Sequence, residues 1–246
     1  MKNFLIALQF LTIIKLSRKI DITEENLGIS MSYFPVVGLC IGLVLVLARW
    51  SLAFVLPSSV VDVLVIAILV VLTGALHLDG FADTVDGLAG RGDREKTLAI
   101  MRDSKIGTFA VVGITLILLL KTTSLASLPL FMKDKSLLLM AVLGRWATVP
   151  LAAFFPYARA GHGTALAFSR FAGIREVIIA SLIALGIAVG LLQYKGLIIF
   201  VAVALVSCLL GLFFKSRIGG VTGDIMGAAC EVSEIVVLFM ISGMFH

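Results

Sequence analysis

Residues 196–214 read GLIIFVAVALVSCLLGLFF, a run without a single charged side chain. A helix that crosses the hydrocarbon core of a bilayer needs about 17–25 residues of this kind, so the run predicts a transmembrane helix. The whole chain has the same character: 60% of its 246 residues are hydrophobic and 14% are charged. A soluble domain carries roughly 25% charged residues. We therefore expect an all-α, polytopic transmembrane helical bundle.

Apolar runs on both sides of this stretch predict about seven spanning helices. The predicted spans are Phe34–Leu56, Val60–Leu78, Thr108–Leu128, Leu137–Phe155, Val177–Leu192, Gly196–Phe214 and Ile225–Phe245. The fifth run is short for a span, so the expected number is seven to within one. Phe4–Ile14 is apolar but too short to cross, which predicts an N-terminal helix in the interface. Since no linker divides the chain, residues 1–246 form one predicted membrane domain.

The positive charges predict how the chain is oriented, because Lys and Arg are retained on the cytoplasmic side. With the N-terminus inside, the opposite loops receive only Lys133, Lys135 and Lys195. The cytoplasmic side receives Lys2, Lys15, Arg18, Lys19, Arg91, Arg94, Lys96, Arg102, Lys105, Arg159, Arg170, Arg175, Lys215 and Arg217. The net charge of +5 thus reflects topology, and without aromatic residues interleaved it gives no indication of nucleic-acid binding. We expect a multi-pass protein of the cell inner membrane.

Acidic residues are concentrated in the predicted cytoplasmic segment 77–107, which begins HLDGFADTVDG. If this segment is helical, Asp79, Asp83 and Asp86 stand at i, i+4 and i+7 and share one face. Three adjacent carboxylates repel one another unless a cation lies between them, and hard oxygen ligands suit Mg²⁺, or Mn²⁺, better than zinc. The spacing predicts a metal site formed by these aspartates, with a solvated loop of locally paired charges as the alternative.

The same segment continues with alternating charges in MRDSKIG, residues 101–107. Arg102 and Lys105 are suited to bind phosphate oxygens, and Asp103 could add a metal ligand or a base. His77 could orient a ligand or donate to a phosphate, although a lone histidine at a helix end is often only hydrogen-bonded. This mixture is typical of phosphoryl transfer, in which positioning and charge neutralisation supply most of the catalysis.

A second motif, GGVTGD at residues 219–224, precedes the last predicted span. Glycines let the backbone approach a ligand, and a helix N-terminus attracts anions, so we expect Thr222 and Asp224 to help bind substrate. Both residues could instead cap the helix. The loop 156–163, PYARAGHG, faces the same side and could hold a phosphorylated substrate or be an ordinary turn.

Charged residues also fall inside predicted spans, where an unpaired charge is costly. Glu231 and Glu234 lie in the last span, and Lys121 and Arg145 lie in two earlier ones. The glutamates either form structural ion pairs, for example with Arg145, or belong to the active site. We expect the two basic residues to pair or to extend toward the interface.

Together these motifs resemble the cobalamin synthase family, the adenosylcobinamide-GDP ribazoletransferases. The resemblance runs nearly end to end and is carried by QFLT at 9–12, FPVVG at 34–38, HLDGFADTVDG at 77–87, MRDSKIG at 101–107 and GVTGD at 220–224. It implies transfer of the cobinamide phosphoryl group from its GDP linkage to a ribose hydroxyl of α-ribazole or α-ribazole 5′-phosphate. GMP is released and adenosylcobalamin, or its 5′-phosphate, is formed with a divalent metal ion.

On this hypothesis, Asp79, Asp83 and Asp86 hold Mg²⁺ against the diphosphate, while Arg102 and Lys105 offset charge on the departing GMP. The proton of the attacking hydroxyl passes to Asp103 or to one of the same three aspartates, of which Asp83 and Asp86 are the catalytic candidates, a role worth about 10²–10⁴ in rate. A homo-oligomer is possible for a membrane enzyme with so large a substrate.

Two further hypotheses compete with this one. The aspartates could form the binding site of a cation transporter, or could belong to a lipid enzyme like the CDP-alcohol phosphotransferases. The latter also place aspartates at helical spacing after an Asp-Gly pair, but Asp83 stands where the pattern requires Arg. That likeness is one of mechanism only.

Overall fold

The computed structural model describes residues 2–15, 22–90, 92–159 and 163–245. Within these ranges the regular structure is helical, apart from one isolated bridge between Tyr157 and Val221, and short turns and loops connect the helices. The helices are α1 (Lys2–Leu11), α2 (Glu24–Ser30), the 3-10 helix η1 (Met31–Tyr33), α3 (Phe34–Ala53), α4 (Ser58–Leu72), α5 (Leu76–Ala89), α6 (Arg94–Ile100), α7 (Thr108–Ser127), α8 (Leu130–Phe154), α9 (Thr164–Phe171), α10 (Ile174–Leu192), α11 (Tyr194–Ile218) and α12 (Gly223–Phe245). The all-α prediction is confirmed.

Over the described residues, 6 helices are long and apolar enough to cross a membrane, or up to 7 if the bent pair α4–α5 counts as one span. This agrees with the predicted number. The helix α1 covers the short apolar run at the N-terminus, and its buried residues are Ile6, Ala7 and Leu11. Arg18, Lys19 and Arg91, whose charges entered the orientation prediction, lie outside the described residues.

The predicted span Val60–Leu78 is wrong as a continuous helix. The chain bends by 89° between α4 and α5. Gly74 and Ala75 both adopt left-handed backbone conformations, with φ of 59° and 55°, and α5 begins afresh at Leu76. The left-handed region is open to glycine at little cost and ends the right-handed helix. The bend directs α5 away from the axis of α4 and brings Asp79 and Asp83 into electrostatic range of Asp224 in the first turn of α12.

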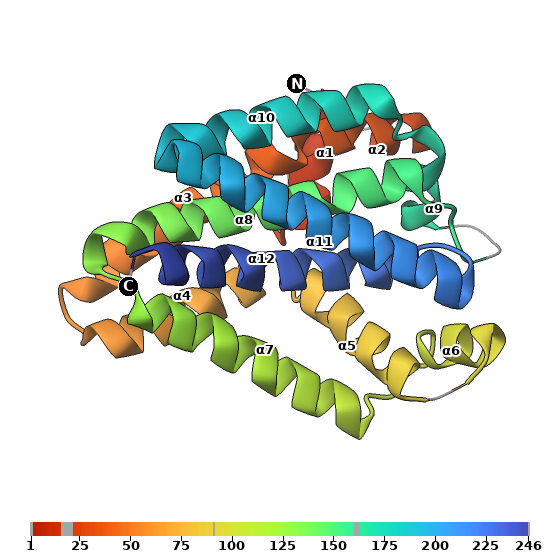
Figure 1. Cartoon of the computed structure of the whole chain (residues 1–246), viewed down its shortest axis with the longest axis horizontal. Helices are drawn as coiled ribbons and strands as arrows, with labels where there is room; N and C mark the ends of the chain where they lie inside the picture. Colours follow the sequence, from red (N-terminus) through yellow and green to blue (C-terminus); the bar gives the residue numbers. More distant parts are fainter. Residues whose placement is uncertain (1, 16–21, 91, 160–162, 246) are drawn as a thin grey trace.

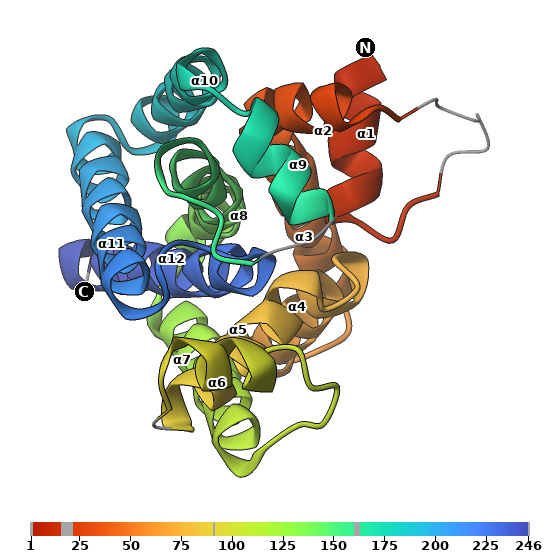
Figure 2. The same cartoon turned by 90° about the vertical axis from the view of Figure 1, so that its right-hand side faces the viewer.

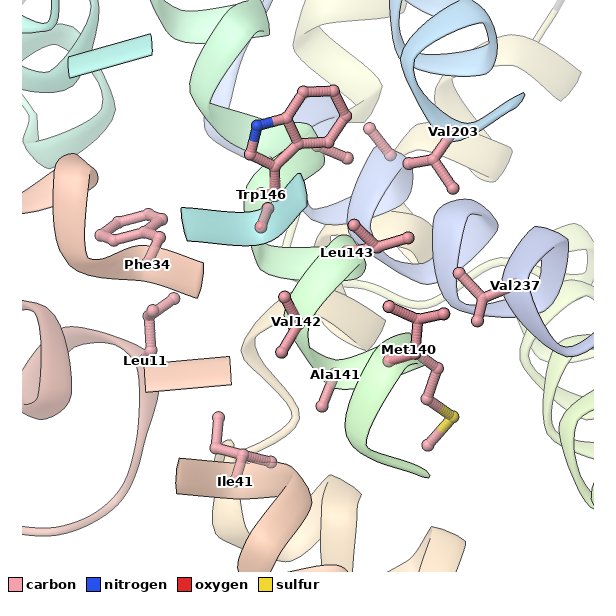
Figure 3. Packing of buried hydrophobic residues seen from close by; sticks show 14 of the residues in the cluster. Leu11, Phe34, Ile41, Met140, Ala141, Val142, Leu143, Trp146, Val203 and Val237 are labelled. Atoms are coloured by element: carbon pink, nitrogen blue, oxygen red, sulfur yellow. The ribbon is translucent and has the colours of Figure 1, made fainter. Parts of the chain in front are cut away.

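The helix α8 lies at the centre of the bundle, with α10, α11 and α12 around it (Figure 2). Most of its residues are buried, whereas only 28% of the residues in the most apolar stretch of α7, α10 and α11 are buried, as expected for helices that face lipid. Figure 3 shows Met140, Val142 and Leu143 of α8 pointing into the core near Ile41 and Val237. The bundle is therefore organised around one helix that is buried along its length.

The helix α8 begins earlier than predicted. The fourth span was expected to start at Leu137, but α8 starts at Leu130, so Lys133 and Lys135 lie in helix and not in a loop. Lys133 is buried and donates to Asp62 at 2.5 Å, and this ion pair connects the start of α8 to α4.

Lys121, Arg145, Glu231 and Glu234 form one buried network. The Lys121 ammonium of α7 donates to Glu231 at 2.6 Å and also contacts Glu234, which in turn pairs with Arg145 of α8. Two cations and two carboxylates balance, so the network places no net charge inside the membrane. The structure therefore supports the ion-pair alternative and fixes α7, α8 and α12 relative to one another.

The short helices α6 and α9 gather at one end of the bundle, together with the end of α11 and the start of α12 (Figure 1). The C-terminus and the beginnings of α4 and α8 lie at the other end. The predicted cytoplasmic segments thus come together at one end, and the candidate site lies there.

Candidate active site

The site is organised where α5 crosses the first turn of α12. A Cβ atom added at Gly80 would lie 2.9 Å from the Cα of Asp224, closer than a side chain tolerates. Glycine is therefore what allows the two backbones to meet. The crossing brings Asp224 into electrostatic range of Asp79 and Asp83, one turn apart on α5. We call Asp79, Asp83 and Asp224 the acid cluster.

Asp86 is directed elsewhere, toward the start of α7. Its carboxylate accepts hydrogen bonds from the backbone N–H groups of Gly107 at 2.6 Å and Ala110 at 2.8 Å. These donors have no partner within their own helix, and a carboxylate at a helix N-terminus also interacts favourably with the helix dipole. Asp86 thus anchors α7 to α5.

The donor set of the acid cluster fits a hard divalent cation in its chemistry, since carboxylate oxygens are the ligands that Mg²⁺ prefers. As the side chains stand, no group of three or more His, Cys, Asp or Glu side chains is close enough to hold a metal ion in the part of the chain that the structure describes. The metal ligands Asp79, Asp83 and Asp86 therefore stay a prediction.

Arg159 connects the acid cluster to the loop after α8. Its guanidinium forms an ion pair with the Asp224 carboxylate and donates to the carbonyl of Met101 at 3.1 Å. The loop is held in place by backbone hydrogen bonds of 2.8 Å from Ala158 to Val221 and from Val221 to Pro156. Ala160, Gly161 and His162 of the same loop lie outside the described residues.

Beside Arg159 lies a cavity of about 430 Å³, here called the arginine cavity. Its lining residues are Arg94, Glu95, Leu98, Ala99, Arg102, Ala158 and Arg159. Arg94 donates to the carbonyl of Ala158 at 3.2 Å, which holds α6 against the loop. Three guanidinium groups around one cavity provide many donors of the geometry that phosphate oxygens accept.

On the other side of Asp224 lies a second cavity, of about 260 Å³. Its walls are mainly apolar, and Phe10, Phe34 and Phe168 supply aromatic rings, so we call it the aromatic cavity. Its lining residues are Phe10, Met31, Phe34, Leu76, His77, Asp79, Gly80, Thr148, Thr164, Ala165, Phe168, Gly223, Asp224, Met226 and Gly227. Asp79 and Asp224 therefore belong both to the acid cluster and to the wall of this cavity.

The other predicted site residues fall in different places. Asp103 and Lys105 are exposed in the loop between α6 and α7, where the Lys105 backbone N–H donates to Asp103 at 3.1 Å, and they line neither cavity. Thr222 is fully buried, and its hydroxyl accepts from the backbone N–H of Ile225 at 3.3 Å, as the capping alternative predicts. His77 is 5% exposed, and its Nδ1 has no hydrogen-bond partner among the described residues.

Two basic residues of the site were not identified from sequence. Arg94 carried no assigned role although it stands in the charged run Asp93-Arg94-Glu95, and Arg159 was considered only as part of its loop. Each stands beside a feature that can be read in the sequence: Arg94 lies between two acidic residues, and Arg159 lies in a loop that contains glycines. Only the packing of α6 against the loop shows that they face one cavity.

The comparison with protein families decides the class of this chain. A family model described as cobalamin-5-phosphate synthase matches residues 3–242. The chain belongs to the cobalamin-5-phosphate synthase family. Two similar proteins, from Acetivibrio thermocellus and Geotalea daltonii, carry the name adenosylcobinamide-GDP ribazoletransferase.

The relative from Acetivibrio thermocellus is 40% identical over 240 residues, which cover 98% of this chain and 97% of the relative. The relative from Geotalea daltonii is 40% identical over 238 residues, covering 97% and 96%. A third ribazoletransferase, from Clostridium acetobutylicum, is 32% identical and covers 100% and 97%. No solved structure matches the chain significantly. The resemblance inferred from the motifs is therefore confirmed at the level of the family.

Proposed function

We propose that this member of the cobalamin-5-phosphate synthase family joins adenosylcobinamide-GDP to α-ribazole or its 5′-phosphate, as the names of its relatives describe. One observation carries the proposal. Asp79 and Asp224 of the acid cluster line the cavity that holds the aromatic rings, and Asp224 pairs with Arg159, one of the three arginines that line the other cavity. A transferase that moves a phosphoryl group from a diphosphate donor to a nucleoside needs a charged site and an apolar site that meet at the reacting atoms.

In the proposed reaction, a ribose hydroxyl oxygen of α-ribazole attacks the phosphorus atom that bears the cobinamide group. A new P–O bond forms, and the P–O bond of the diphosphate linkage breaks to release GMP. The hydroxyl proton passes to a carboxylate, for which we propose Asp83, since it interacts electrostatically with both Asp224 and Asp79. Arg94, Arg102 and Arg159 line the cavity that would hold the phosphates of the leaving GMP.

The proposed metal ion is Mg²⁺, or Mn²⁺, held by Asp79, Asp83 and Asp224. When bound, it would neutralise charge on the diphosphate. The sequence predicted Asp86 as the third metal ligand. We propose Asp224 instead, because the Asp86 carboxylate already accepts hydrogen bonds from backbone N–H groups at the start of α7. Arg159 holds the Asp224 carboxylate in position beside α5.

The proposed location is the cell inner membrane with the site facing the cytoplasm. Arg94, Arg102, Arg159, Arg170 and Lys215 belong to segments at the end of the bundle that carries the site. An excess of such residues is retained on the cytoplasmic side. The homo-oligomer considered from the sequence stays a prediction.

The transporter alternative is weakened by where the acids lie. The acid cluster is at one end of the bundle, and the buried glutamates Glu231 and Glu234 are neutralised by Lys121 and Arg145. Ion pathways place acids along the membrane interior. A sodium- or proton-flux assay in liposomes tests this alternative directly.

The decisive experiment measures GMP release from adenosylcobinamide-GDP by purified protein with α-ribazole and Mg²⁺. We expect metal-dependent release by the wild type and loss of release in Asp83→Asn, which should remain folded in the membrane. Asp134→Asn, at the opposite end of the bundle where Asp134 pairs with Arg49, is the matched control and should retain activity. Wild-type turnover by Asp83→Asn would remove the carboxylate from the mechanism.

A further inference from the structure

We infer that the aromatic cavity binds the flat ring system of the acceptor nucleoside, with the ribose directed toward Asp79 and Asp224. The inference rests on the proposed function and adds a place for one substrate. Ribazole carries a fused aromatic bicycle in which one ring nitrogen is unsubstituted. That chemistry combines a large apolar surface with a single hydrogen-bond acceptor.

The size of the cavity favours the acceptor ring over the donor. Pockets that enclose a drug-sized ligand have volumes of about 300–1,000 Å³. The aromatic cavity, at about 260 Å³, is just below this range. It can admit a bicyclic ring, whereas the corrin macrocycle of the donor is too large to enter.

Aromatic side chains form one side of the cavity. The ring centroids of Phe10 and Phe168 are 4.8 Å apart and those of Phe34 and Phe168 are 5.6 Å apart, both in edge-to-face arrangements. Phe34 and Phe168 are each 2% exposed, so their positions are fixed by packing in the core. Rigid aromatic walls favour a flat apolar ring at a small cost in conformational entropy.

His77 supplies an independent observation that points to a ligand. His77 lines the cavity and is only 5% exposed, and its Nδ1 lacks a hydrogen-bond partner among the described residues. A buried polar nitrogen without a partner is unfavourable unless something else satisfies it. Nδ1 itself is shielded from the cavity as the side chain stands, so a rotation of the imidazole has to turn it inward. With the proton on Nδ1, His77 can then donate to the unsubstituted ring nitrogen of the acceptor.

The two cavities differ in the charge of the residues that line them, and the groups that each would bind differ correspondingly. The phosphates of the donor match the arginine cavity, and the uncharged ring of the acceptor matches the aromatic cavity. Asp224 lines the aromatic cavity and pairs with Arg159, which lines the arginine cavity. The attacking hydroxyl and the phosphorus atom would therefore meet at the acid cluster.

The first test fills the cavity with Ala165→Phe and measures KM for α-ribazole and for adenosylcobinamide-GDP separately. Ala165 lies on α9 and lines the cavity. We expect KM for α-ribazole to rise about tenfold or more, while KM for the donor stays within about twofold. Ala126→Phe, on the exposed face of α7, is the matched control and should change neither value. A rise confined to the donor KM would overturn the inference.

The second test removes the predicted hydrogen bond without filling the cavity. The wild type should prefer α-ribazole over the analogue whose free ring nitrogen is replaced by C–H, and His77→Ala should lose that preference. An equal preference in both proteins would overturn the role of His77. If the wild type released no GMP and bound no α-ribazole in calorimetry, the proposed function would fail. Normal GMP release with an unchanged ribazole KM in Ala165→Phe would defeat only the present inference.

Discussion

Gly80→Ala is the smallest change that should separate the acid cluster. The added Cβ would lie 2.9 Å from both the Cα and the carbonyl oxygen of Asp224, whereas ordinary van der Waals contact begins at 3.4 Å. Both atoms belong to the backbone, so no side-chain rotation can relieve the contact. The first turn of α12 must therefore move away from α5 by about 0.5 Å or more.

The displacement should affect catalysis more than stability. A misplacement of about 1 Å in an active site can cost roughly 10²-fold in rate. For a shift of half this size or more, we expect kcat to fall about 10–100-fold, which corresponds to about 1.4–2.7 kcal/mol of activation free energy. Overpacking of this kind costs about 1–3 kcal/mol of folding free energy, partly offset by the better helix propensity of Ala.

The assay is GMP release at saturating substrates, with thermal unfolding in detergent measured on the same preparation. Gly186→Ala is the matched control, because a Cβ at Gly186 meets nothing within 4 Å and α10 lies away from the site. We expect this control to keep full activity. If Gly80→Ala released GMP at the wild-type rate and retained the wild-type metal dependence, close approach of α5 and α12 would not be a requirement for catalysis.

Three further changes test other parts of the structure. Glu234→Gln removes the partner of Arg145 from the buried network and should destabilise the bundle by roughly 3–5 kcal/mol, seen as a lower Tm, whereas the exposed Glu24→Gln should leave Tm unchanged. Asp86→Ala removes the cap of α7 and should cost about 1 kcal/mol in the same measurement; an unchanged Tm would contradict the capping role. Arg159→Gln should raise KM for adenosylcobinamide-GDP at least several-fold by steady-state kinetics, and an effect on the α-ribazole KM alone would argue against the arginine cavity as the phosphate site.

The spanning helices could be predicted from the sequence because the bilayer imposes a length and a composition on each of them. Gly196–Phe214 lies within α11, and Thr108–Leu128 differs from α7 by one residue. The failure at Val60–Leu78 has a physical cause. Hydropathy does not register a change in backbone direction, and here a left-handed glycine, Gly74, followed by Ala75, turned the chain inside an apolar run.

The aspartates of α5 could be recognised from their spacing, but the different role of each one could not be predicted from it. Helical periodicity places Asp79, Asp83 and Asp86 on one face and treats them as equivalent. The structure distinguishes them, because the start of α7 lies beside Asp86 and the start of α12 lies beside Asp83. Which neighbour a side chain meets depends on contacts between distant segments, and local spacing does not encode these.

The bend between α4 and α5 explains why the acid cluster needs residues from two motifs. Had the helix continued straight from α4, the aspartates of α5 would have followed the axis of that span out of the bundle. The bend of 89° instead lays α5 across the bundle end, where Gly80 meets the first turn of α12. The motif at 77–87 and the motif at 219–224 are therefore two halves of one site, and the turn at Gly74 is what joins them. Straightening that turn should abolish activity even with every carboxylate in place.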